Sequence, residues 1–104
     1  MAICTHTDRI ALDTLPERVD GCEDCLRAGD GWVHLRICST CGHVGCCDDS
    51  PNRHATAHHD ASGHPIIRSL EPGEDWSWCY VDQRGFVTDR PAGETAIPPS
   101  PLLG

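Results

Sequence analysis

Two Cys-x-x-Cys pairs and a spaced series of histidines constrain this chain more than any other feature of its sequence. A fifth cysteine and three histidines follow the second pair within a short stretch. In order, these residues are Cys22, Cys25, Cys38, Cys41, Cys46, His54, His58 and His64. Such thiolate and imidazole donors supply two complete tetrahedral spheres of the kind that structural zinc requires. The sequence therefore predicts a zinc-binding domain, although spacing alone leaves open whether Cys46 or its neighbour Cys47 is a donor.

The composition explains why such a chain needs metal in order to fold. Leu, Ile, Val and Phe make up only 19 of the 104 residues, and the formal net charge is −8. Such values are typical of chains that cannot bury enough apolar surface to fold. Structural zinc, in contrast, contributes about 10–16 kcal/mol of apparent binding free energy to folding. We therefore expect zinc to stabilise a single domain over residues 1–90.

Charge and hydropathy exclude several classes of protein. The chain has 16 acidic and 8 basic residues, whereas nucleic-acid-binding surfaces carry positive charge to neutralise phosphates. We therefore predict no nucleic-acid partner. No apolar run approaches the length of about 18 residues that a membrane span requires, and the N-terminus lacks the apolar region of a signal peptide. These features predict a cytoplasmic protein with reduced cysteines and no membrane partner.

Alternation and turn signals predict a small α+β domain. Strands are expected over residues 32–37, 66–70, 76–82 and 86–88, in an antiparallel sheet packed on one main helix. That helix is predicted to begin with Ser50 as its N-cap and Pro51 at its first position, and to stop before Gly63. Residues 1–30 are predicted to be irregular. The proline-rich residues 91–104 are predicted to form a disordered tail.

A third group of donors is predicted where the N-terminus meets the end of the domain. Cys4 and His6 are expected to approach Cys79. Asp82 follows Cys79 by three residues, where the second cysteine of a Cys-x-x-Cys pair would stand. This arrangement predicts a third zinc site, and the alternative is a free Cys79 with Cys4 at the surface.

Three aromatic residues alternate along the strand predicted over residues 76–82. Trp76, Trp78 and Tyr80 share one face of that strand, and Cys79 points to the other. Trp76 is expected to belong to the core. Trp78 and Tyr80 flank the predicted ligand Cys79, and we expect them to form an aromatic shelf that lines a pocket. Such a shelf, backed by a metal site, is suited to binding a peptide.

With these residues assembled, the chain resembles the UBP-type zinc finger, the ubiquitin-tail-binding domain of ubiquitin-specific proteases and of a cytoplasmic histone deacetylase. The resemblance covers Cys4 to about Phe86 and looks most like the compact standalone version found in bacteria. It implies a first zinc sphere of Cys22, Cys25, Cys46 and His54 and a second of Cys38, Cys41, His58 and His64. In the third sphere, Cys4, His6 and Cys79 match the family pattern, and Asp82 replaces the usual cysteine.

The resemblance also carries an expectation about the ligand. Ubiquitin-binding members hold a free Gly-Gly carboxyl terminus with aromatic side chains and an arginine just after the cysteine that matches Cys46. Trp78 and Tyr80 match two of the aromatic positions. The arginine is missing, because residues 47–49 are Cys-Asp-Asp. Acidic residues repel a carboxylate, which disfavours ubiquitin itself as the ligand.

We therefore expect a binding module without enzymatic activity that captures a peptide or protein chain terminus over the aromatic shelf. Arg53 or Arg68 is the candidate for the missing positive charge. Two alternatives belong to other classes of protein. A zinc metalloenzyme needs an open coordination position, which only the Asp82 site could supply. A zinc-storage or redox-sensing protein would use the unassigned thiol of Cys47.

Overall fold

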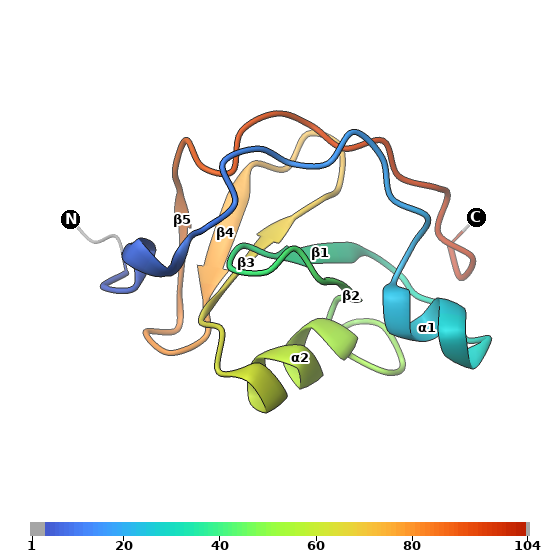
Figure 1. Cartoon of the computed structure of the whole chain (residues 1–104). Coiled ribbons are helices and arrows are strands. Elements are labelled where there is room, and N and C mark those ends of the chain that lie inside the picture. Colours follow the sequence, from blue (N-terminus) through green and yellow to red (C-terminus); the bar gives the residue numbers. More distant parts are fainter. Residues whose placement is uncertain (1–3, 104) are drawn as a thin grey trace.

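A five-stranded antiparallel sheet forms the centre of the computed structural model, which describes residues 4–103 (Figure 1). The strands lie in the order β2-β1-β3-β4-β5. Their bounds are Leu35–Cys38 (β1), Val44–Cys46 (β2), Ile66–Ser69 (β3), Trp76–Cys79 (β4) and Arg84–Val87 (β5). The helices are the 3-10 helix η1 (Thr7–Arg9), α1 (Glu23–Ala28) and α2 (His54–Ser62). This architecture confirms the predicted α+β class.

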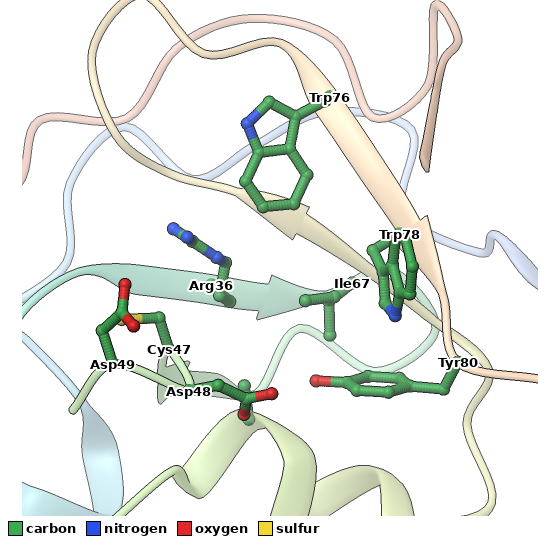
Figure 2. A pocket seen from close by; sticks show the side chains of 9 residues that line it. Arg36, Cys47, Asp48, Asp49, Ile67, Trp76, Trp78 and Tyr80 are labelled. Atoms are coloured by element: carbon green, nitrogen blue, oxygen red, sulfur yellow. The ribbon is translucent and has the colours of Figure 1, made fainter. Parts of the chain in front are cut away.

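Helix α2 packs against β1 and β2, and a glycine makes its close approach possible. A Cβ atom added to Gly45 would lie 2.7 Å from the backbone nitrogen of Ala55 and 2.8 Å from its Cα. Arg36 pairs with Gly45 across the two strands, so both residues face the helix side of the sheet (Figure 2). The sheet therefore presents a charged side chain next to the helix.

The start of α2 differs from the prediction. The helix begins at His54, three residues after Pro51, and Arg53 precedes it in the left-handed conformation with φ 48°. Ser50 does not cap this helix, because its hydroxyl accepts a hydrogen bond from the Val33 backbone N–H at 2.8 Å. The predicted end is correct, since Gly63 closes the helix in the left-handed conformation.

Besides η1, two short elements lie where no element was predicted. Helix α1 occupies part of the segment predicted to be irregular, and the Cys22 sulfur caps it by accepting from the Cys25 backbone N–H at 3.4 Å. Gly29 ends the helix in the left-handed conformation. Strand β2 is only three residues long and pairs with β1. Both elements carry cysteines, so their positions matter for the metal sites.

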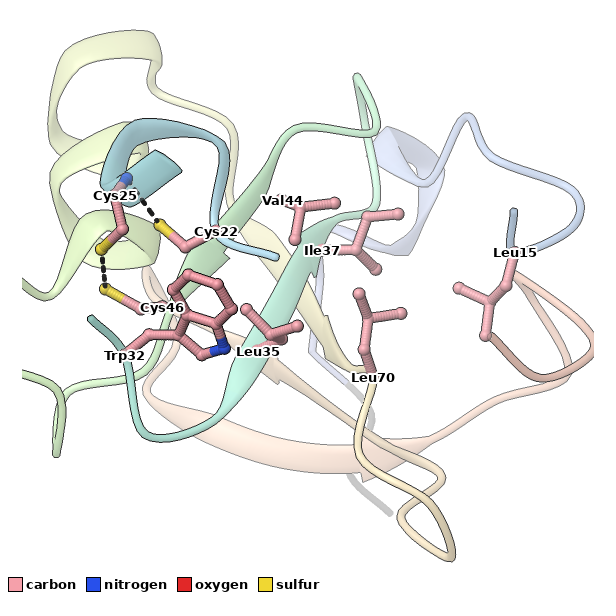
Figure 3. Close-up of a cluster of buried hydrophobic side chains, with 9 residues drawn as sticks. All are labelled: Leu15, Cys22, Cys25, Trp32, Leu35, Ile37, Val44, Cys46 and Leu70. Carbon is pink, nitrogen blue, oxygen red and sulfur yellow. Dashed lines mark hydrogen bonds between the residues drawn. The ribbon is translucent and has the colours of Figure 1, made fainter. Parts of the chain in front are cut away.

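The buried core consists of two clusters that both contain cysteine (Figure 3). Leu35, Ile37 and Leu70 lie in the larger cluster, which extends to Cys22, Cys25 and Cys46. The smaller cluster joins Cys4 and Cys79 to three apolar residues: Ile10, Ile66 and Phe86. Cysteines of the first and third donor groups therefore belong to the buried core.

The C-terminal segment differs from the predicted disordered tail. Residues 91–103, here called the C-terminal strap, run beside residues 13–19, as the red and blue segments of Figure 1 show. Ala92 and Ala96 each donate and accept backbone hydrogen bonds of 2.8–3.1 Å with that segment. The Ser100 hydroxyl donates to the Trp32 carbonyl oxygen at 2.6 Å. The strap is ordered because non-proline residues between its prolines retain the N–H groups needed for pairing.

Within residues 4–103, no helix has the length and apolar character needed to cross a membrane.

The approach of α2 to β2 gives a test of this packing. We expect Gly45→Ala to lower the free energy of unfolding of the zinc-loaded protein by about 1–3 kcal/mol, because the added methyl group meets helix backbone that cannot move aside. Gly85→Ala is the matched control, since its Cβ would lie 3.6 Å from the nearest atom, the Ser77 carbonyl oxygen. Urea denaturation, followed by tryptophan fluorescence, measures the free energy of unfolding of both variants. Equal effects of the two substitutions would contradict the proposed packing.

Candidate metal centres and the adjoining pocket

The first donor cluster joins α1, β2 and the start of α2. The Cys25 and Cys46 sulfurs, which Figure 3 shows beside each other, lie 3.9 Å apart. His54 Nδ1 lies 3.3, 3.2 and 3.6 Å from the sulfurs of Cys22, Cys25 and Cys46. Tetrahedral zinc with bonds of about 2.3 Å to sulfur and 2.0–2.1 Å to nitrogen places two sulfurs about 3.8 Å apart and a sulfur and a nitrogen about 3.6 Å apart. The donors therefore fit a zinc ion.

The second cluster joins the end of β1, the turn after it, and α2. Cys38 Sγ lies 3.4 Å from His64 Nδ1, and Cys41 Sγ lies 3.3 Å from His58 Nε2. His58 follows His54 by one helical turn. One helix therefore supplies a donor to the first cluster and another donor to the second.

The third cluster joins the N-terminal segment to the end of β4. His6 Nδ1 lies 3.6 Å from Cys79 Sγ and 3.3 Å from Asp82 Oδ2, and Cys4 completes the group. In each of the three clusters, all four donor atoms lie within 4.8 Å of one another. The structure thus brings the twelve predicted donors together in the three predicted groups, and their assignment as zinc ligands stays a prediction. Cys46, and not Cys47, contributes its sulfur to the first group.

Burial makes the thiolate form of these cysteines costly when no cation is bound. Burial raises the pKa of the Cys22 thiol to about 12 and that of the Cys4 thiol to about 11. Without a cation, these groups are neutral at pH 7. Backbone N–H groups point at the sulfurs, for example from His54 to Cys46 at 3.2 Å. Such donors stabilise thiolates, which are the form that binds metal.

Two histidines outside the three donor clusters contact residues of the second cluster. The His43 ring stacks on His58 with 4.3 Å between centroids, and its Nε2 lies 3.0 Å from Asp24 Oδ2. His59 Nδ1 lies 2.7 Å from the carbonyl oxygen of His64. His59 also stacks on Tyr80 with 4.4 Å between ring centroids. His43 and His59 therefore support the second cluster from outside it, and His59 connects that cluster to the aromatic shelf.

A pocket of about 230 Å³ opens on the helix side of the sheet, between the aromatic shelf and the loop after β2 (Figure 2). Its walls are three aromatic rings, two small or thiol side chains, one isoleucine, one arginine and two aspartates. These residues are Arg36, Cys47, Asp48, Asp49, Ala55, Ile67, Trp76, Trp78 and Tyr80. Trp78 and Tyr80 line the pocket as predicted. Trp76 was expected in the core, but it is only partly buried and lines the same pocket.

The arginine of the pocket is one that sequence reasoning missed. The Arg36 guanidinium lies over the Trp76 ring, 4.6 Å from its centroid, and the side chain is 13% exposed. Arg68 was a candidate for this charge, but it pairs with Ile37 and Ser77 and so faces the other side of the sheet. Arg53 does not line the pocket. The alternation of apolar and polar residues along the predicted strand could have identified Arg36, because Arg36 is the polar residue between the core residues Leu35 and Ile37.

Hydrogen bonds fix the aromatic shelf against α2. The Thr56 hydroxyl oxygen lies 2.6 Å from Asp48 Oδ1 and 3.2 Å from the Tyr80 hydroxyl. Burial raises the pKa of Tyr80, and the nearby Asp48 carboxylate raises it further, whereas the Thr56 hydroxyl lowers it. The phenol therefore remains neutral at physiological pH and holds its ring in place.

Comparisons with known proteins agree with this geometry. Residues 22–91 match the family described as the Zn-finger in ubiquitin-hydrolases and other protein. The chain is similar to protein RPA1320 of Rhodopseudomonas palustris, whose structure was determined by solution NMR, with 50% sequence identity and a TM-score of 0.78. That likeness covers 95% of this chain and 97% of the other. The fold and the donor clusters define a zinc-binding module, and its three clusters can hold zinc ions. The chain belongs to the UBP-type zinc-finger family.

The number of protons that zinc binding releases should match the number of cysteine donors. At neutral pH we expect about seven protons for three ions, one for each cysteine of the three clusters, because free thiols have a pKa of about 8.5 and bind metal only as thiolates. Zinc affinity should therefore rise with pH and fall on acidification. Calorimetry in buffers of different ionisation enthalpy measures the number. Release of fewer than about three protons would contradict thiolate coordination.

Tyr80 is the only tyrosine of the chain, so its ionisation can be followed directly. We expect tyrosinate absorbance to develop above the ordinary pKa of about 10, because burial raises the pKa of Tyr80. The stability contributed by the neutral phenol should be complete below pH 10 and should decline as the pH rises through the folded-state pKa. Asp48→Asn should lower the midpoint of the tyrosinate titration, since it removes a negative charge near the Tyr80 hydroxyl. An unchanged midpoint in this variant would argue against the contact.

Proposed function

We propose that this protein is a zinc-stabilised binding module whose pocket captures the carboxyl terminus of a peptide or protein chain. The single observation that carries the proposal is the largely buried Arg36 side chain in an aromatic pocket. The family description mentions ubiquitin hydrolases, but ubiquitin itself is not the ligand proposed here, because residues 47–49 are Cys-Asp-Asp where the resemblance places an arginine. Asp48 and Asp49 also line this pocket, so the carboxylate is proposed to bind at Arg36, the basic residue among the residues that line it.

Arg36 is suited to hold a carboxylate. Its Nη1 donates to the Leu35 carbonyl oxygen at 3.0 Å and to Ser69 Oγ at 3.4 Å. Glu74 Oε1 lies 4.0 Å from the same nitrogen. Nη2 and Nε have no hydrogen-bond partner among residues 4–103, so they remain able to donate to a ligand. A guanidinium held in this way forms charge-assisted hydrogen bonds with a carboxylate.

The dimensions of the pocket favour a chain end over an internal segment. A volume of about 230 Å³ corresponds to a cube with an edge of about 6 Å, which is the length of about two extended residues. Trp78 and Tyr80 provide flat apolar walls against which a narrow backbone packs. The last residues of a chain with small side chains would fit this space and bring a carboxylate to Arg36.

The proposed role is binding and not catalysis. The first two clusters provide four sulfur or nitrogen donors each, which is the closed arrangement of structural zinc. The pocket lies beside these clusters and is lined by none of their donor residues. The metal ions therefore support the shape of the pocket from behind its walls.

Peptides with free and amidated carboxyl groups test this proposal. We expect acetylated pentapeptides ending in Gly-Gly to shift the indole resonances of Trp76 and Trp78, and the amidated peptides to bind at least about tenfold more weakly, since a charge-assisted hydrogen bond contributes about 1.5–3 kcal/mol. Arg36→Gln should reduce the binding of the free acid by a similar factor. The matched control is Arg53→Gln, which changes an arginine outside the pocket. Equal binding of acid and amide would refute the proposal.

A further inference from the structure

The charges that line the pocket around Arg36 are not balanced. Among the described residues of its wall, Arg36 is basic, whereas Asp48 and Asp49 are acidic, so these three side chains together carry a formal charge of −1. The Arg36 side chain is 13% exposed, and both aspartates are exposed. A ligand that carries only a carboxylate is therefore attracted to the buried Arg36 and repelled by the aspartates. Binding a carboxylate thus leaves two negative charges of the pocket without a counterpart.

The positive group and one of the negative groups lie in separate parts of the pocket. Figure 2 shows the Arg36 guanidinium apart from the Asp48 carboxylate, which is directed toward the Tyr80 hydroxyl. The Thr56 hydroxyl donates to Asp48 Oδ1 at 2.6 Å and so fixes this carboxylate. In the described part of the chain, Asp48 Oδ2 and both carboxylate oxygens of Asp49 have no hydrogen-bond or salt-bridge partner. These three oxygens therefore remain able to accept hydrogen bonds from a ligand.

An apolar surface separates the two charged parts of the pocket. Ile67 lies between Arg36 and Tyr80 in Figure 2, and the Trp78 ring borders the same space. These side chains pack well against carbon atoms, so they suit the uncharged middle of a ligand. The volume of about 230 Å³ limits the distance between the ends of a ligand to about 6–7 Å, the length of two extended residues.

We propose that the ligand of this pocket is zwitterionic, with a terminal carboxylate that binds Arg36 and an ammonium group about 6–7 Å away that binds Asp48 and Asp49. This inference rests on the proposed function, because it assigns the same carboxylate to Arg36. An ammonium group has three N–H donors, and the two aspartates offer free acceptor oxygens for them. The aromatic ring of Tyr80 beside Asp48 also favours a cation.

Two kinds of molecule carry this pair of charges at this distance. One is a free dipeptide, whose amino and carboxyl termini are about two residues apart. The other is a chain that ends in lysine, whose ammonium group stands at the end of a flexible four-carbon stem. In both, the positive group offsets the carboxylate, so binding adds no net negative charge to the pocket.

Two pairs of ligands test the ammonium site of the zinc-loaded protein. Free diglycine is compared with acetyl-diglycine, and acetyl-glycyl-lysine with acetyl-glycyl-norleucine, by following the tryptophan indole resonances during titration. We expect the member with the ammonium group to bind about five- to tenfold more tightly in at least one pair, as for a partly exposed ion pair beside an aromatic ring. A preference in the first pair indicates a dipeptide, and a preference in the second indicates a C-terminal lysine. Equal binding within both pairs would overturn the proposal.

Substitutions show whether the two aspartates cause this preference. Asp48→Asn and Asp49→Asn should each reduce it, and the double variant should abolish it while keeping the preference for acid over amide. The matched control is Asp60→Asn, which removes an exposed carboxylate of α2 that does not line the pocket. A preference that survives in the double variant would overturn the role of the aspartates.

The same titrations separate this inference from the proposed function. Tighter binding of acids than of amides, without any preference for the ammonium group, would refute the zwitterionic ligand and leave the capture of a carboxyl terminus intact. Equal binding of acids and amides would instead refute the proposed function itself.

Discussion

Each metal-donor cluster takes its side chains from several secondary-structure elements, and the rest of this structure depends on this constraint. Helix α2 contributes His54 to the first cluster and His58 to the second, while the cysteines come from α1, β1, β2 and the turns beside them. The buried cysteines also belong to the apolar core. Because few large apolar residues are available, bound ions and core side chains must act together, and neither alone is sufficient to fix the helix against the sheet.

The proposed binding pocket depends on the same constraint. Cys47 follows a donor of the first cluster and lines the pocket. His59 follows His58 of the second cluster and stacks on Tyr80. Each cluster is therefore next to one part of the pocket wall, since Cys79 of the third cluster lies between Trp78 and Tyr80 along the chain. A pocket supported in this way is organised before a ligand arrives, which reduces the entropic cost of binding.

The twelve predicted donors come together in the three predicted groups, and most of them could be selected because their spacing is a local property of the sequence. Their assignment as zinc ligands stays a prediction. Strands β3 and β4 were also predicted, since alternation and aromatic content identify them. Helix α1 and strand β2 were missed because they are short and depend on contacts made by Cys22 and Gly45 in the folded chain. The C-terminal strap was missed because composition indicates proline content but not pairing with residues 13–19. Arg36 was not selected as a pocket residue, because its role depends on a contact with Trp76 that forms only when the sheet brings β1 and β4 near each other.

Strand β4 has two functional faces, with Trp78 directed into the pocket and Cys79 directed into the third cluster. A single layer of backbone thus separates the proposed peptide site from the candidate metal site. By thermodynamic linkage, any factor by which an occupied metal centre changes the affinity for a peptide must equal the factor by which the peptide changes the affinity for the metal. The amount of available zinc and the amount of captured partner would then each report on the other through one strand.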